Sequence, residues 1–270
     1  MGEIIKAVLI GLVQGITEWL PVSSTGHMII LDEFVRLDVS PAFWELFLVV
    51  IQLASVLAVP ALYFDRLNPL DRRKTDIERR GTLSLWKNIA LAVLPSGIIG
   101  LLLDDWLDAH IYNSTTVIAA LAFYGILFIV CDRRKDRIGL HKTKIFAKDA
   151  LGLGTFQTLA LIPGTSRSGS TLLGGLVLGL DRAETAEFSF FMALPTMLGA
   201  SGLKLVKFIQ SGAVISGQER RILLWGSVTA FLVSMAAMRY LVGYVRSHGL
   251  RAFGIYRLIL AALAALVLRR

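Results

Sequence analysis

The sequence predicts an all-α polytopic membrane protein, built as an inverted repeat of six transmembrane helices plus two re-entrant helical hairpins. Three observations support this fold class. Of the 270 residues, 55% are hydrophobic and only 18% are charged, which is too apolar for an ordinary soluble domain. Two short apolar runs are followed by three long ones, and this order occurs twice along the chain. Proline, serine and glutamate residues at matching places in the two halves are separated by a constant spacing. We expect one membrane domain over 1–270, with repeats at about 1–131 and 143–270.

Six apolar runs are long enough to cross a bilayer. They cover residues 42–63, 88–103, 114–131, 187–208, 222–243 and 253–268. Four shorter runs cover 4–13, 26–37, 149–162 and 168–180, and they form two pairs. Each pair is joined by a polar turn that begins with proline, Pro21 to His27 and Pro163 to Gly169. Non-helical backbone at membrane depth must be buried in protein or line a cavity. Each pair therefore predicts a hairpin that enters the membrane and returns.

The two hairpins predict an internal duplication. Equivalent landmarks lie 142 residues apart: Pro21 and Pro163, Ser24 and Ser166, Glu45 and Glu187. Three predicted spans separate the copies, and because three is odd the copies have opposite orientations. Many transporters use this plan and place their site near the middle of the membrane, at the interface between the repeats.

Basic residues orient the predicted spans. Residues 64–87 and 132–148 each carry seven lysines or arginines, whereas 104–113 carries none. Because basic loops stay in the cytoplasm, both termini are expected outside, with the first hairpin entering from outside and the second from the cytoplasm. Arg220 and Arg221, in an outer loop, fit the rule less well. The net charge of +8 is thus a topology signal, and we expect no nucleic-acid partner.

Gln14 and Glu18 are polar residues inside the first predicted hairpin. They are four residues apart and therefore share one face of a helix. A carboxylate at membrane depth costs on the order of 3 kcal/mol, so its presence favours a metal ligand or a proton acceptor. The alternative is a packing ion pair with a basic residue. Gln14 contributes an amide oxygen without charge.

The turn that follows combines hydroxyls with an imidazole. Ser23, Ser24 and Thr25 precede an apolar run, where one hydroxyl is expected to cap the helix. His27 lies three residues after Ser24, a spacing that places a hydroxyl and an imidazole on one helical face, as in a nucleophile with its base. The alternative is that His27 only packs and hydrogen bonds.

The second turn, residues 163–171, predicts an anion site. Arg167 needs an anionic partner at this depth, and its planar fork suits phosphate. Ser166 and Ser168 flank it, and the first amides of the next helix favour phosphate as well. The alternative partner is a carboxylate, Glu18 or Glu187. Two opposed hairpins would direct two helix N-termini at one anion.

Three motifs in these turns resemble those of the bacterial undecaprenyl-diphosphatases, the bacitracin-resistance family. They read Gln14-Gly-Ile-Thr-Glu18, Leu20-Pro-Val-Ser-Ser-Thr-Gly-His27 and Pro163-Gly-Thr-Ser-Arg-Ser-Gly-Ser-Thr171. The resemblance covers essentially the whole chain. One position is variable in the family: many members have Glu where this chain has Gln14, so an amide replaces a second carboxylate here.

The resemblance implies a bacterial plasma-membrane enzyme that removes the terminal phosphate from undecaprenyl diphosphate and so recycles the lipid carrier for cell-wall synthesis. It implies dependence on Mg²⁺ or Ca²⁺, a site that opens to the extracytoplasmic side, and often a homodimer. We expect Glu18, Ser24, His27 and Arg167 to be catalytic, with Glu18 as the metal ligand and Ser24 as the nucleophile; attack by water or by His27 is the alternative. The expected substrate-binding residues are Gln14, Ser23, Thr25, Ser166, Ser168 and Thr171.

Two other classes share some of these features. A transporter or flippase of a polyprenyl phosphate carrier would also use an inverted repeat with a site at mid-membrane. Membrane acid-phosphatase-like lipid phosphatases have a similar turn with serine, glycine and histidine, but they need a second histidine soon after a Ser-Arg pair. No histidine lies between Arg167 and His248, which argues against the latter class. Phosphate release by the purified protein separates an enzyme from a transporter.

Overall fold

The computed structural model describes residues 1–135 and 142–268 of the chain, and most of them are helical. Part of the second basic segment, residues 136–141, lies outside the described residues. The helices are α1 (Glu3–Thr17), α2 (Ser24–Phe34), α3 (Pro41–Leu62), α4 (Phe64–Leu67), α5 (Asp76–His110), α6 (Ser114–Lys135), α7 (Ala147–Thr158), the short 3₁₀ helix η1 (Leu159–Leu161), α8 (Arg167–Leu178), α9 (Arg182–Gln210), α10 (Gly217–Ser247) and α11 (Arg251–Val267).

All ten apolar runs predicted from the sequence are largely helical. Within the described ranges, five helices are long and apolar enough to cross a membrane: α3, α5 as far as Leu103, α6 as far as Asp132, α9 and α10. The sixth predicted span corresponds to α11, which has 17 residues. The four short runs form α1, α2, α7 with η1, and α8. The protein is therefore an all-α, polytopic membrane protein.

Helix α5 extends beyond its predicted span in both directions. It begins twelve residues earlier because Thr75 and Glu78 form a capping box, in which Thr75 Oγ1 accepts a hydrogen bond from the Glu78 amide at 3.3 Å and Glu78 Oε2 accepts one from the Thr75 amide at 2.8 Å. Residues 104–110 contain no glycine or proline, and the helix continues to His110. The prediction of a loop over 104–113 was therefore largely wrong.

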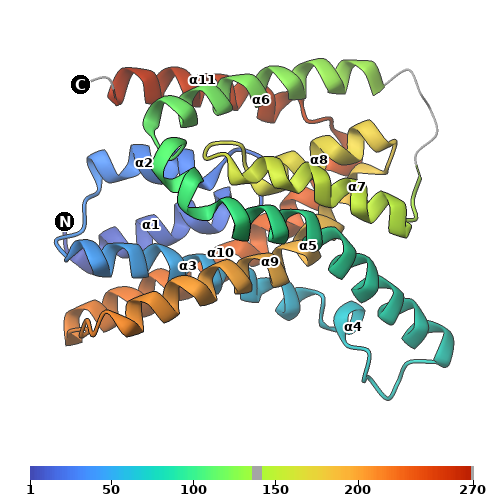
Figure 1. Cartoon of the computed structure of the whole chain (residues 1–270), viewed down its shortest axis with the longest axis horizontal. Helices are drawn as coiled ribbons and strands as arrows, with labels where there is room; N and C mark the ends of the chain where they lie inside the picture. Colours follow the sequence, from blue (N-terminus) through green and yellow to red (C-terminus); the bar gives the residue numbers. More distant parts are fainter. Residues whose placement is uncertain (136–141, 269–270) are drawn as a thin grey trace.

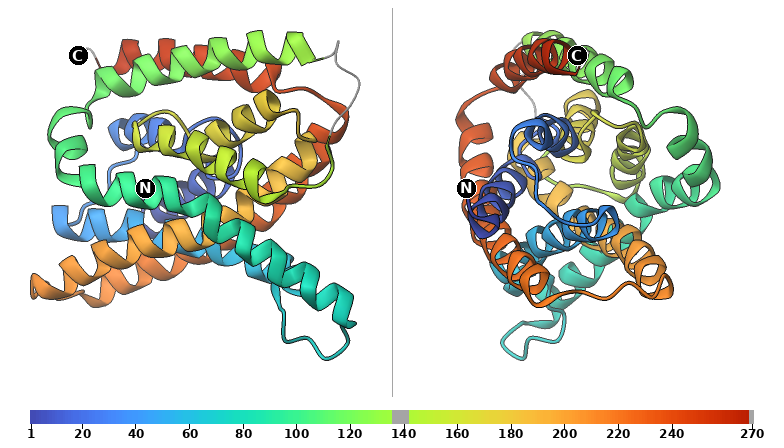
Figure 2. Two further views of the ribbon diagram at one scale, coloured as in Figure 1. Left: turned by 45° about the vertical axis from the view of Figure 1, so that its right-hand side comes forward. Right: turned by 90° about the vertical axis from the view of Figure 1, so that its left-hand side faces the viewer.

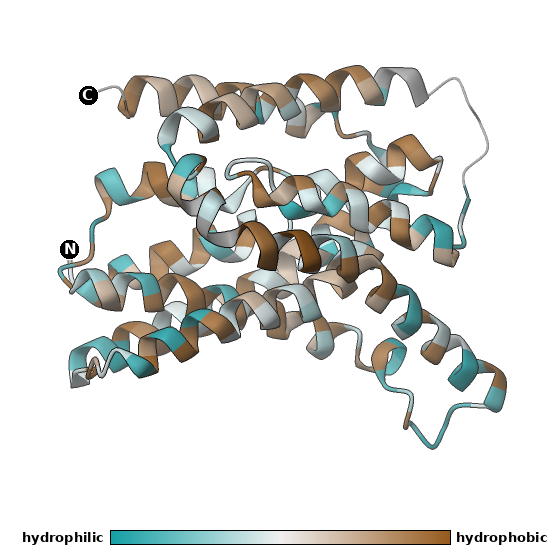
Figure 3. Ribbon diagram, viewed as in Figure 1, coloured by the Kyte–Doolittle hydropathy of each residue, from teal (hydrophilic) through white to brown (hydrophobic). Residues whose placement is uncertain are grey.

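The second helices of the two hairpins, α2 and α8, and the turns before them lie in the middle of the molecule. Figure 1 shows α6 and α11 side by side along one edge, with α2, α7 and α8 between them and the long helices α3, α9 and α10. The two views in Figure 2 show the same enclosure of the hairpins by longer helices. Large apolar side chains are exposed on the outer helices, including Phe123, Leu232 and Leu266, and Figure 3 shows the apolar colouring along these helices. Such surfaces suit contact with lipid.

Glycines allow the first helix of each hairpin to touch a long helix directly. A Cβ atom on Gly11 of α1 would collide with the backbone oxygen of Gly226 on α10. A Cβ on Gly154 of α7 would collide with the backbone oxygen of Ala92 on α5. Gly15 also meets α10, so two small residues four positions apart let α1 pack closely on that helix. Both hairpins are thus fixed against a long helix.

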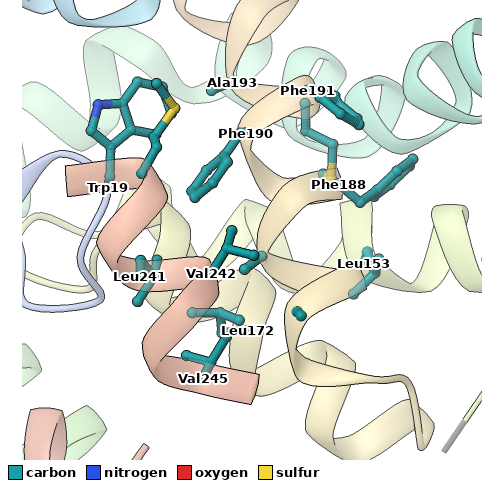
Figure 4. Close-up of a cluster of buried hydrophobic side chains, with 14 of the residues drawn as sticks. Trp19, Leu153, Leu172, Phe188, Phe190, Phe191, Ala193, Leu241, Val242 and Val245 are labelled. Carbon is teal, nitrogen blue, oxygen red and sulfur yellow. The ribbon is translucent and has the colours of Figure 1, made fainter. Parts of the chain in front are cut away.

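A buried apolar cluster lies beside the two turns. Trp19 is fully buried and makes an edge-to-face contact with Phe190 of α9, with the ring centroids 5.1 Å apart. Figure 4 shows these rings among side chains from α7, α8, α9 and α10, including Leu153, Leu172 and Leu241. Residues from both halves of the chain therefore support the end of α1, where Glu18 lies.

The segment between α4 and α5 is held by charge. Asp71 accepts hydrogen bonds from the backbone amide and the guanidinium of Arg73, at 2.9 Å and 2.8 Å. The Arg73 side chain lowers the pKa of Asp71 to about 2. Since the Arg73 side chain is exposed, this pair organises the turn locally and adds little to the stability of the fold.

Candidate functional site

The two hairpin turns share an unusual backbone conformation. Ser23 and Ser166 both have φ of 74°, and they are the non-glycine residues with positive φ in the described chain. Each is the N-cap of the following helix, and its hydroxyl accepts from a glycine amide three residues later, Gly26 at 3.3 Å or Gly169 at 3.2 Å. A serine with positive φ costs of order 1–3 kcal/mol, and such strain gathers at functional sites.

This geometry corrects the repeat alignment by one residue. Ser23, and not Ser24, is the structural counterpart of Ser166, so the spacing at the turns is 143 residues. Ser24 then corresponds to Arg167, the first residue of α8. The sequence alignment matched the prolines, Pro21 with Pro163, but these lie two and three residues before the respective caps. The corrected spacing also pairs Gln14 with Gln157 and Gly11 with Gly154.

Glu18 is the buried carboxylate between the two turns. It follows α1 directly and is 5% exposed. Its Oε2 atom accepts from Gln14 Nε2 at 3.1 Å and from the Ser24 hydroxyl at 3.2 Å, and its Oε1 atom accepts from Arg167 at 3.4 Å. An ionised carboxylate has about four acceptor positions. Three are used by these donors, so Glu18 connects the first hairpin to the second.

Arg167 joins residues from three parts of the chain. Its guanidinium donates to the backbone oxygen of Ser189 on α9 at 2.9 Å and to Glu18, and it lies 5.6 Å from the centre of the Trp19 ring. Its Nε atom is buried and has no hydrogen-bond partner among the described residues. The guanidinium is therefore oriented by protein on two sides while one donor stays available.

Ser24 and His27 do not contact each other. Ser24 donates to Glu18, whereas both imidazole nitrogens of His27 have other partners. Nδ1 lies 2.7 Å from the Ser23 backbone oxygen, and Nε2 lies 2.7 Å from the hydroxyl of Tyr256 on α11. In this conformation Glu18 is the base nearest to Ser24. The predicted pairing of Ser24 with His27 was wrong for this state.

The remaining predicted residues have mostly structural contacts. Ser166 and Ser168 lie with their hydroxyls 3.2 Å apart, and Ser168 also donates to the backbone oxygen of Leu20 at 3.2 Å, which ties α8 to the first turn. Thr171 donates to the Arg167 backbone oxygen at 3.0 Å and is fully buried. Thr25 is half-buried, and within the described ranges it has no hydrogen-bond partner.

Glu187 and Glu45 lie away from this constellation. Glu187 forms an ion pair with Arg66 and lies 3.9 Å from Arg246. Glu45 is exposed near the start of α3. Of the two carboxylates considered as partners of Arg167, Glu18 is therefore the one that meets it, and equivalent positions in the sequence repeat did not give equivalent roles.

Arg257 on α11 is a residue that the sequence analysis missed. It is fully buried, yet its guanidinium donates to backbone oxygens of both turns. The distances are 2.9 Å to Thr165, 2.8 Å to Gly164 and 3.3 Å to Pro21. The signal was present, because an arginine inside an apolar run is costly. Arg257 fastens the two turns to each other from the side of α11.

The constellation suits chemistry on a phosphate group. It places a guanidinium donor, a buried carboxylate and a hydroxyl bonded to that carboxylate within one small region. A cation and helix N-termini stabilise the charge of a phosphoryl group. The carboxylate can accept a proton from the hydroxyl, which makes the hydroxyl a nucleophile.

Known proteins share this sequence over nearly its full length. The family model for the bacitracin resistance protein BacA matches residues 7–263. A Clostridioides difficile protein named undecaprenyl-diphosphatase 1 is 51% identical, covering 96% of this chain and 93% of its own. Proteins named undecaprenyl-diphosphatase from Enterococcus faecalis and Lactiplantibacillus plantarum are each 47% identical, covering 96% and 97% of this chain and 95% and 97% of their own. The chain therefore belongs to the BacA family of bacitracin resistance proteins.

Proposed function

We propose that the chain hydrolyses undecaprenyl diphosphate to undecaprenyl phosphate and inorganic phosphate at the junction of its two hairpins. The observation that carries this proposal is the meeting of Arg167 and Glu18, 149 residues apart in sequence, at 3.4 Å and in a buried setting. The product is the monophosphate lipid carrier of cell-wall synthesis. The family resemblance and the named relatives agree with this reaction.

The proposed step begins with Ser24 as nucleophile. Its Oγ atom attacks the terminal phosphorus while its proton passes to Glu18, with which it already forms a hydrogen bond at 3.2 Å. The bond between that phosphorus and the bridging oxygen breaks, and undecaprenyl phosphate leaves. Water then attacks the phosphoserine: His27 Nε2 accepts the proton of the water, Glu18 returns its proton to the departing Ser24 oxygen, and inorganic phosphate is released. Arg167 stabilises the charge on the transferred phosphoryl group.

A divalent cation fits this site only together with the substrate. In the part of the chain that the structure describes, no group of three or more His, Cys, Asp or Glu side chains could hold a metal by itself. Mg²⁺ is commonly bound by one or two carboxylates with substrate phosphates, and Glu18 supplies one carboxylate. Mg²⁺ or Ca²⁺, when bound there, would neutralise charge on the diphosphate. Gln14 is placed to support Glu18, to which it donates.

We further propose an inverted repeat of six spans, α11 being the sixth, with repeats at about 1–131 and 143–270 and two re-entrant hairpins. Matching caps at Ser23 and Ser166 support it, as do the close helix contacts at Gly11 and Gly154. The basic segments support an orientation in the bacterial plasma membrane with those segments in the cytoplasm. The family resemblance alone supports a substrate site that opens to the extracytoplasmic side, and a homodimer.

Replacement of Glu18 by glutamine tests the proposed site. Glu18→Gln keeps the shape but removes the charge and the base, so phosphate release from a polyprenyl diphosphate should fall roughly 10²-fold or more. Glu45→Gln, an exposed change on α3, should keep full activity. Chelation should inactivate the wild type, and Mg²⁺ or Ca²⁺ should restore it. Near-normal turnover of Glu18→Gln would remove Glu18 from the site, and no release by the wild type in detergent would favour a transporter.

A further inference from the structure

His27 is held from both sides by groups of different elements. Its Nδ1 lies 2.7 Å from the backbone oxygen of Ser23, on the strained turn before α2. Its Nε2 lies 2.7 Å from the hydroxyl of Tyr256 on α11, and the two rings are nearly parallel, with their centroids 5.6 Å apart. The imidazole is thus fixed in orientation, and the second of these contacts joins positions 229 residues apart.

The partners also determine where the imidazole proton lies. A backbone oxygen can only accept, so Nδ1 carries the hydrogen. In a neutral imidazole Nε2 then has a lone pair, and the Tyr256 hydroxyl must donate to it. An imidazolium would instead donate from Nε2 to the same hydroxyl, which can also accept. The Ser23 backbone oxygen therefore sets the tautomer of the neutral ring, and Tyr256 holds its Nε2 atom in either charge state.

The charged and titratable groups near this end of α2 are few among the described residues. α2 packs against α1, α6 and α11. Glu18 at the end of α1 contacts Ser24 rather than His27. Tyr124 on α6 lies under the guanidinium of Arg257, and Arg257 itself donates to backbone oxygens of the turns. Of these groups, Tyr256 is the one that hydrogen bonds the imidazole.

We propose that Tyr256 is a positioning residue for His27. It acts through His27, holding the imidazole in its orientation through the contact with Nε2 until the substrate is bound. This inference rests on the proposed role of His27 in the site. With this role, α11 contributes two adjacent residues to the site: Tyr256, which holds His27, and Arg257, which holds the two hairpin turns. The site therefore extends beyond the motifs of the two hairpins.

Chemical labelling tests the contact without any measurement of activity. Diethyl pyrocarbonate acylates neutral imidazole nitrogens, and mass spectrometry of the purified full-length protein locates the label. In Tyr256→Phe the Nε2 atom of His27 loses its donor, so its acylation rate should rise roughly fivefold, the change expected from one hydrogen bond of ordinary net strength. His110 and His248 serve as internal references. Tyr240→Phe, an exposed tyrosine on α10, should leave the rate unchanged. An unchanged rate in Tyr256→Phe would overturn the proposal.

Kinetics test whether the contact serves the reaction. Because Tyr256 holds the imidazole in one orientation, Tyr256→Phe should lower kcat roughly fivefold, the change expected from one hydrogen bond of ordinary net strength, with little change in KM. The double variant His27→Asn with Tyr256→Phe should be no slower than His27→Asn alone. An unchanged kcat in Tyr256→Phe, or a double variant that is slower than His27→Asn by the same factor that Tyr256→Phe costs the wild type, would overturn the positioning role. If His27→Asn itself keeps full activity, the proposed role of His27 in the site fails, even where the labelling result stands.

Discussion

Replacement of Arg257 by methionine removes the guanidinium that fastens both hairpin turns. The guanidinium makes two short hydrogen bonds, to Thr165 at 2.9 Å and to Gly164 at 2.8 Å, and two longer ones. A hydrogen bond to a charged group contributes about 1.5–3 kcal/mol, so the short pair contributes about 3–6 kcal/mol. Relief of the desolvated charge offsets part of this. We therefore expect a loss near the lower end, about 3 kcal/mol.

Thermal unfolding of the purified protein in detergent measures this loss. About 3 kcal/mol corresponds to a fall in Tm of roughly 6–12 °C for a chain of this size. Phosphate release should fall as well, because Pro21, Gly164 and Thr165 place the two turns. Arg251→Met is the matched control, since Arg251 is exposed at the start of the same helix. If the Tm of Arg257→Met lies within about 2 °C of wild type, the turns do not depend on this clamp.

Two further predictions compare neighbouring or matched positions. Ser24→Ala should lose at least tenfold more phosphate release than Ser23→Ala. Ser24 donates to Glu18, whereas Ser23 caps α2, a role worth about 1 kcal/mol of stability. Similar losses in both variants would make Ser24 a structural residue. Gly154→Ala should lower Tm by at least about 4 °C, since its Cβ would collide with Ala92 on α5. The control is Gly97→Ala on α5, where the added Cβ meets open space and Tm should not fall. Equal Tm values for the two variants would contradict the close packing.

Much of the fold follows from the apolar pattern alone. Every run placed in the membrane is largely helical, because run length and the cost of unpaired backbone in lipid leave few choices. The boundaries of α5 were harder to predict, since a polar helix that leaves the membrane has no apolar signal. The capping box at Thr75 and Glu78 marks its start.

The members of the site were predictable, but their pairing was not. Depth and charge identified Glu18 and Arg167, which the fold brings together. The spacing of Ser24 and His27 suggested a pair, and both residues do lie in α2, yet Ser24 meets Glu18 and His27 meets Tyr256. Spacing along a helix indicates which residues share a face, but it does not determine which partner each side chain meets. Tyr256 comes from α11, and no local pattern connects it to the first hairpin.

The turnover of Arg167→Lys tests the central claim most directly, namely that the two hairpins together hold a phosphate group. Lysine keeps the charge but loses the planar guanidinium, which donates to Ser189 and Glu18 and has a third donor, Nε, without a partner among the described residues. Phosphate release from a polyprenyl diphosphate is measured on the purified variant, with folding checked by its elution profile and with Arg251→Lys as the control. The account predicts a loss of roughly 10²-fold or more. A well-folded Arg167→Lys protein within about threefold of wild type, well under the 1.4 kcal/mol of a tenfold change, would show that Arg167 only neutralises Glu18.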